Sequence, residues 1–273
     1  MWLHNLNPTL VHLGPLEIRW YGLVYVFGFF LSVWWMHYLS RKGKLKLTSN
    51  EIWDFMFYLM LGVIIGSRVF EVFWEPQIYL YHPLELLKVW KGGMSFHGGL
   101  AGTLIAGWLY CRKKKLELWQ TADIIAVPAM FALALGRIAN FINGELVGRV
   151  WNGRWCVIFP DYDQYCRHPS ILYAAAYRFL IFGELLWLSW KKEFKAGFIF
   201  WNFVLLEGIG RFLVDFYRED SLYWSLSLGQ WFSAVMIVTS VIVFIKYYPK
   251  EWRKIYGELL RVRQINDDQT KRN

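Results

Sequence analysis

The chain has 273 residues, of which 56% are hydrophobic and 20% aromatic, including 17 tryptophans. A soluble domain of this size cannot bury so much apolar surface, so the composition excludes an ordinary globular protein and indicates an integral membrane protein. The formal net charge of +9 comes with no basic stripe in a soluble segment, which argues against nucleic-acid binding and fits contact with anionic lipid.

Apolar runs define the predicted helices. Seven runs approach the length of about 20 residues that a bilayer core of about 30 Å requires. They lie at residues 20–40, 52–70, 96–111, 121–139, 171–189, 197–216 and 229–247. We therefore predict an all-α integral membrane protein with seven transmembrane helices in a single domain, residues 1–273. The third run is short and contains Gly98 and Gly99, so we expect its outer end to be irregular or re-entrant.

Basic residues predict the orientation of these helices. Four Lys/Arg clusters follow the first, third, fifth and seventh runs and hold 15 basic residues, against seven in the other connections and the N-terminal segment. Short cytoplasmic loops retain Lys and Arg, so we expect the N-terminus outside and a cytoplasmic tail at about 248–273. The external segments are then about 71–95, where PLELLKVW fits a surface helix, and 141–170. Residues 1–18 are expected along the outer interface.

The external segment at 141–170 contains Cys156 and Cys166. Outside the cytosol these two residues fit either a disulfide or two unpaired thiols, and the sequence leaves both open.

Polar residues recur near the outer ends of six of the predicted segments. An ionised group at this depth costs roughly 2.5 to 3.5 kcal/mol on insertion scales, so such residues usually face a cavity. In chain order they are Tyr21, Arg68, His97, Arg137, Asn140, Glu145, His168, Glu207, Arg211 and Asp215. Gly144 falls close to the helical face of Arg137 and Asn140.

These residue types indicate an anion site. Arg137 and Arg211, without metal-ligand spacing around them, suit the planar oxygens of a phosphate, so we expect no metal and no cofactor. A phosphate at headgroup depth suggests a phospholipid. His97 has an unperturbed pKa of about 6.5 and is the candidate base, and Gly98 and Gly99 allow a ligand or a neighbouring helix to approach the backbone.

Structural roles are the alternatives for several of these residues. Arg68 fits a side chain that extends to the interface or pairs with Glu71, three residues later. Glu145 fits a partner of a neighbouring arginine, and Asp215 fits a counter-ion of Arg211 four residues earlier. The pair Gly98 and Gly102 fits a notch for helix packing.

Five strings carry a family resemblance. In order and spacing, YGLVYVFGF, GGMSFHGGLAG, GRIANFINGELVGR, RHPSILY and GRFLVDFYR resemble those of the bacterial prolipoprotein diacylglyceryl transferases. The resemblance implies a plasma-membrane enzyme whose active site faces the outer leaflet. It would transfer the diacylglyceryl group of phosphatidylglycerol to the lipobox cysteine of a preprolipoprotein, giving a thioether and glycerol 1-phosphate. It implicates the positions Tyr21, His97, Arg137, Asn140, Glu145 and Arg211.

We expect Arg137 and Arg211 to hold the phosphodiester and to stabilise charge on the leaving group as sulfur attacks the glycerol carbon. His97 takes the thiol proton, or else only orients the substrate while the arginines lower the thiol pKa. The chain also departs from the family. Glu71 and Glu207 stand where relatives commonly have Tyr, and Asp215 is shorter than the usual Glu. Ile171 and Ala174 replace a Gln and a Glu of the family pattern. Carboxylates beside a phosphate weaken its binding unless they neutralise an arginine or stay protonated.

A secondary transporter of an anionic solute is the alternative function. Transporters place their site near the midplane between repeats. Here the polar groups gather toward one face, and no repeat pairs the two halves of the sequence, so the transferase is favoured.

Overall fold

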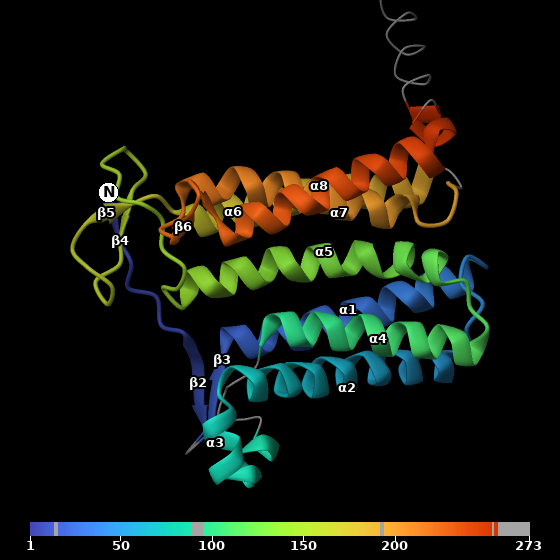
Figure 1. Cartoon of the computed structure of the whole chain (residues 1–273), viewed down its shortest axis with the longest axis horizontal. Helices are drawn as coiled ribbons and strands as arrows, with labels where there is room; N and C mark the ends of the chain where they lie inside the picture. The colour runs from blue at the N-terminus through green and yellow to red at the C-terminus, as the bar shows by residue number, and fades with distance from the viewer. Residues whose placement is uncertain (14–15, 89–94, 192–193, 253, 256–273) are drawn as a thin grey trace, which may run out of the picture. The chain divides into compact units, whose positions relative to one another are not determined.

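A computed structural model describes residues 1–13, 16–88, 95–191, 194–252 and 254–255. The chain is mostly helical (Figure 1). It divides into two compact units, the first formed by residues 1–28 with the chain from 122 onward, and the second by residues 29–121.

The second unit contains a tightly packed helix pair. Its helices are most of α1 (Trp20–Arg41), α2 (Ser49–Trp74), α3 (Pro76–Tyr81) and α4 (Phe96–Lys114), with a 3-10 helix, η1 (Pro83–Leu87). Glycines allow α2 and α4 to touch through their backbones, because a Cβ atom on Gly62 would lie 2.5 Å from the carbonyl oxygen of Gly102. The expected irregular start of α4 is wrong, since the helix is regular from Phe96, with Ser95 as its N-cap. Helix packing, not a broken backbone, explains these glycines.

The first unit contains the long helices α5 (Leu118–Ile142), α6 (Ser170–Lys191), α7 (Phe198–Val214) and α8 (Leu228–Tyr247), with a 3-10 helix, η3 (Asp215–Tyr217). Helix α7 packs against both α6 and α8 (Figure 1). Asp123 of α5 fixes the start of α7, because the Asp123 carboxylate accepts 2.7 Å hydrogen bonds from the backbone N–H groups of Gly197 and Phe200. A carboxylate at a helix N-terminus accepts hydrogen bonds from the free N–H groups and interacts favourably with the helix dipole.

Short strands are a difference from the predicted all-α fold. The described part contains β1 (Trp2–Leu3), β2 (Thr9–Leu13), β3 (Leu16–Arg19), β4 (Val157–Ile158), β5 (Cys166–Arg167), β6 (Leu222–Tyr223) and β7 (Leu226–Ser227). Strand β1 pairs in parallel with β4, which pairs antiparallel with β5. Cys156 and Cys166 form a disulfide beside this sheet, so the first of the two alternatives for these cysteines is correct. Strands of two to five residues are too short for alternating hydrophobicity to reveal them.

Five described helices are long and apolar enough to cross a membrane, namely α1, α2, α5, α6 and α8. This describes a multi-pass membrane protein. The other two predicted spans are also helical, but α7 has only 17 residues and α4 ends in Arg112, Lys113 and Lys114. Within PLELLKVW, Pro83–Leu87 is 3-10 helix, while Val89 and Trp90 lie outside the described residues. Most of the predicted tail, residues 256–273, also lies outside them.

Candidate functional site

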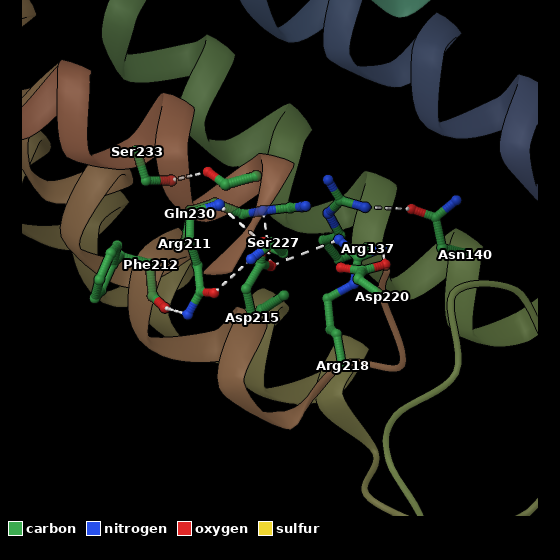
Figure 2. A network of polar contacts seen from close by, with 12 residues as sticks. Arg137, Asn140, Arg211, Phe212, Asp215, Arg218, Asp220, Ser227, Gln230 and Ser233 are labelled. Atoms are coloured by element: carbon green, nitrogen blue, oxygen red, sulfur yellow. Dashed lines mark hydrogen bonds and ion pairs between the residues drawn. The ribbon is translucent and has the colours of Figure 1, made fainter. Parts of the chain in front are cut away.

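A small, partly open cavity lies in the first unit, where α5, α6, α7 and η3 meet. Its wall combines guanidinium groups with apolar side chains. The lining residues are Arg137, Leu146, Ser170, Ile171, Ala174, Arg211, Val214, Asp215 and Arg218. Figure 2 shows the side chains of Arg137, Arg211, Asp215 and Arg218 close to one another. Three cations on a partly apolar wall suit an anion that also carries a hydrocarbon part.

Arg137 is oriented by the sequence that follows it. Its Nη1 atom donates to Asn140 Oδ1 at 3.2 Å (Figure 2), and Asn140 Nδ2 donates to Glu145 Oε2 at 2.9 Å. Asn143 Nδ2 donates to Glu145 Oε1 at 3.0 Å. The chain folds back after α5 and allows this, because the N–H of Glu145 donates to the carbonyl of Asn140 at 3.1 Å. Glu145 therefore acts on Arg137 through Asn140.

The turn after α5 needs unusual backbone conformations. Gly144 has φ of +69° and Leu146, which lines the cavity, has φ of +55°. A positive φ is strained for leucine, and strain of this kind tends to occur at functional sites. His4 supports the turn from the N-terminal segment: it is buried, and its Nε2 lies 2.7 Å from the carbonyl oxygen of Phe141.

Arg211 is held by Asp215. The Nε atom of Arg211 lies 2.8 Å from Asp215 Oδ1, and Asp215 Oδ2 accepts a 3.0 Å hydrogen bond from Ser227 Oγ. Arg218 Nη1 lies 3.6 Å from the same carboxylate. The side chain of Asp215 is fully buried. Asp215 is thus a counter-ion of Arg211, which is the structural role that the sequence offered as an alternative. Arg218 shares this counter-ion.

Glu207 contacts a different arginine. It forms an ion pair with Arg178 of α6, and Tyr177 Oη donates to its Oε1 at 3.1 Å. Glu207 and Asp215, two of the carboxylates that depart from the family pattern, are therefore paired with arginines. The charges of Arg178, Arg211 and Arg218 all act on Arg137. Arg218 also pairs with Asp220, so the four arginines face the carboxylates of Glu207, Asp215 and Asp220, and Glu145 reaches Arg137 through Asn140.

The remaining predicted residues of the first unit lie around this network. Tyr21 accepts a 3.1 Å hydrogen bond from Tyr25, and the charges of Arg137 and Glu145 act on Tyr25. The imidazole of His168 stacks on Trp151, with ring centroids 4.3 Å apart and planes 7° apart. Burial lowers the pKa of His168. His168 is therefore an aromatic packing residue just before α6.

The other predicted residues belong to the second unit. Arg68 is buried, and its Nη1 donates to Tyr79 Oη at 3.2 Å, so it does not extend to the surface. His97 lies in the first turn of α4 and is exposed. Gly98 and Gly99 are buried against α2, where a Cβ on Gly99 would lie 2.7 Å from Ser67 Oγ. Substrate contacts by these residues stay predictions.

Comparison with known proteins identifies the family. A family model described as prolipoprotein diacylglyceryl transferase matches residues 8–246. The chain belongs to this family. Bacterial relatives named phosphatidylglycerol–prolipoprotein diacylglyceryl transferase include one from Geobacter sulfurreducens, 42% identical over 226 residues, which are 82% of this chain and 87% of the relative. Others are from Cupriavidus metallidurans, 40% identical over 252 residues (89% and 93%), and Aeromonas hydrophila, 41% identical over 245 residues (88% and 89%).

Sequence reasoning did not single out three polar residues at or near the cavity of this transferase-family chain. Ser170 and Arg218 line the cavity, and Arg178 pairs with Glu207. Arg178 had a usable signal, because it stands inside the apolar run 171–189, where a charge is expensive. Arg218 follows Arg211 by seven residues, a spacing that would place both on one face of a continuous helix, although α7 ends at Val214. Ser170 had no signal beyond its place before an apolar run.

Proposed function

We propose that this chain transfers the diacylglyceryl group of phosphatidylglycerol to the lipobox cysteine of preprolipoproteins, the first step of bacterial lipoprotein maturation. The observation that carries the proposal is the cavity lined by Arg137, Arg211 and Arg218 in a member of this family. A phospholipid headgroup offers phosphate oxygens to guanidinium groups. Its glycerol and acyl part suits the apolar wall of Leu146 and Val214.

The proposed reaction is a displacement at carbon. The thiolate sulfur of the lipobox cysteine attacks the diacylglycerol carbon that bears the phosphate oxygen. A carbon–sulfur bond forms as the carbon–oxygen bond breaks, and glycerol 1-phosphate leaves with the bonding electron pair. Arg137 and Arg211 stabilise the negative charge that grows on the departing phosphate. Electrostatic stabilisation of this kind is usually the largest single contribution of a preorganised active site to the reaction rate.

The thiol must lose its proton before it attacks, because the thiolate is the nucleophile and a free cysteine has a pKa of about 8.5. His97 is the proposed base. Arg137 and Arg211 would also favour the thiolate electrostatically. Replacement of His97 by Asn or Gln separates these contributions, because full retained transfer would remove the base assignment.

The other proposed site residues position the arginines or the lipid. Asn140 and Glu145 hold Arg137, as their hydrogen bonds indicate. Tyr21 donates to a phosphate oxygen, and Gly144 keeps the turn beside Asn140 open to the substrate. Arg68, His168, Glu207 and Asp215 are secondary candidates for substrate contacts.

The proposed topology places all seven long helices, α4 and α7 included, across the bacterial inner membrane. The basic clusters after α1, α4, α6 and α8 support a cytoplasmic position for these ends. The N-terminus and the disulfide then lie outside, where disulfides persist. The cavity opens toward the outer leaflet, from which phosphatidylglycerol enters laterally.

A reconstituted assay tests the proposal. Purified protein is mixed with phosphatidylglycerol labelled in its acyl chains and with a lipobox peptide, and the peptide is examined for a thioether-linked diacylglyceryl group. We expect one lipid per peptide and one glycerol 1-phosphate per turnover. A peptide with Ser in place of the lipobox cysteine is the control. Uptake of an anionic solute by sealed vesicles, without any lipidated peptide, would contradict the proposal and support the transporter.

A further inference from the structure

Two buried hydrogen-bond donors in the cavity have no partner within the described part of the chain. They are the hydroxyl of Ser170 and the Nε–H group of Arg218. Ser170 is 1% exposed, and both residues line the cavity together with Arg137 and Arg211. Buried polar groups in folded proteins nearly always have a partner, so an unpartnered one needs an explanation.

The surroundings of each donor explain why it is free for a ligand. Arg218 uses its terminal nitrogens on carboxylates, with Nη1 3.6 Å from Asp215 and Nη2 3.1 Å from Asp220, which leaves Nε. Ser170 is the first residue of α6, a helix of 22 residues. The N-terminus of a long helix carries partial positive charge and favours an anion.

Both donors require an acceptor, and their neighbours specify its charge. Arg137 and Arg211 on the same wall favour an anion over a neutral acceptor. A tetrahedral oxyanion can accept from a hydroxyl, a helix N-terminus and several guanidinium groups at once, because each of its oxygens carries more than one lone pair.

We propose that Ser170 and Arg218 bind the non-bridging phosphate oxygens of the substrate, and that the same donors hold the phosphate of the leaving group. This inference rests on the proposed function. In this proposal Arg137 and Arg211 supply positive charge to the phosphate site. Ser170 supplies a directional hydrogen bond that sets the angle of the phosphate toward the attacked carbon.

Ser240 of α8 provides a matched comparison inside the same unit. Its hydroxyl is also fully buried and unpartnered in the described structure, but Ser240 is not among the residues that line the cavity. A buried orphan hydroxyl alone therefore does not mark a ligand site. What distinguishes Ser170 is its position beside three arginines.

The test compares Ser170→Ala with Ser240→Ala in purified full-length protein. Transfer is measured against phosphatidylglycerol concentration, and inorganic phosphate and glycerol 1-phosphate are tested as inhibitors. We expect Ser170→Ala to raise KM for the lipid and Ki for both inhibitors by about tenfold, as loss of a charge-assisted hydrogen bond would. Ser240→Ala should leave all three constants within about twofold. Arg218→Lys, which keeps the charge but lacks Nε, should also raise both Ki values.

A second readout separates this inference from the proposed function. Thermal unfolding with and without inorganic phosphate reports binding in the absence of turnover, and the ligand-free melting temperature shows whether each variant is folded. Wild-type protein that transfers lipid, together with a folded Ser170→Ala variant whose KM and Ki match those of Ser240→Ala, would overturn the inference alone. Wild-type protein without transfer activity, but with phosphate stabilisation that Ser170→Ala loses, would overturn the proposed function and support the anion subsite.

Discussion

Asp215 holds the guanidinium group of Arg211 through an ion pair in which Oδ1 lies 2.8 Å from Nε. The carboxylate is fully buried and also receives a hydrogen bond from Ser227 of the turn before α8. Because Arg211 stands on α7 and Ser227 at the start of α8, one carboxylate joins two helices at the cavity. The orientation of Arg211 therefore depends on Asp215.

Replacing Asp215 with Asn tests this dependence. Removal of one partner of a buried charge pair usually costs about 3 to 5 kcal/mol, and here it leaves Arg211 and Arg218 without their shared counter-ion. We expect a clear fall in the free energy of unfolding and at least about a tenfold loss of transfer, since misorientation of a catalytic group is costly. Thermal unfolding in detergent and the peptide assay measure both. Asp220→Asn, which removes only a partly exposed partner of Arg218, is the control; an equal effect of the two variants would refute the special role of Asp215.

The helices were largely predictable because lipid solvation requires long apolar runs, and each of the seven predicted runs coincides with a helix. The string GRIANFINGEL was also informative, since Arg137, Asn140 and Glu145 form one hydrogen-bonded chain there. Polar residues of that kind at the end of an apolar run usually have a functional role, because their placement in a membrane segment is costly.

Pairings between helices could not be predicted. Glu207 precedes Arg211 by one turn of the same helix, so sequence spacing indicates that pair. The structure instead places Glu207 against Arg178, whose helix neighbours α7 only through the tertiary fold. The strand pairing of β1 with β4 is equally nonlocal, since it joins Trp2 to Val157.

The Arg178–Glu207 pair leads to a double-substitution prediction. Glu207→Gln leaves the buried guanidinium of Arg178 without its carboxylate, and we expect a loss of about 3 to 5 kcal/mol in stability. Arg178→Met together with Glu207→Gln should recover most of that loss, because no unpaired charge is left and Gln still accepts from Tyr177. Thermal unfolding of the single and double variants measures the coupling. Glu251→Gln is the control. It weakens an ion pair with Lys254, whose side chain is 45% exposed, and should lower the free energy of unfolding by under about 1 kcal/mol. Additive effects of the two substitutions would argue against the pair.

His4 gives a prediction about the turn after α5. His4→Ala removes one of two hydrogen-bond partners of the Phe141 carbonyl, which still accepts from the N–H of Gly144 at 3.0 Å, so we expect a loss of about 0.5 to 1.5 kcal/mol. The turn that places Glu145 on Asn140 then loses its support from the N-terminal segment, so we expect KM for phosphatidylglycerol to rise more than kcat falls. His12→Ala is the control because its side chain is exposed. Unchanged KM in a destabilised His4→Ala protein would show that His4 stabilises the fold without positioning the site.

The stacking of His168 on Trp151 predicts how stability depends on pH. Burial lowers the pKa of His168, so the folded protein holds the neutral imidazole at a pH where the unfolded chain, with a pKa of about 6.5, already binds a proton. Stability linked to this group is therefore complete above about pH 6.5 and is lost as pH falls from there through the folded-state pKa. His168→Gln cannot bind this proton, so its melting temperature should fall less steeply between about pH 6.5 and 5 than that of the wild type. His82→Gln, at an exposed position, should keep the wild-type slope. Identical slopes for wild type and His168→Gln would mean that another group controls the acid sensitivity.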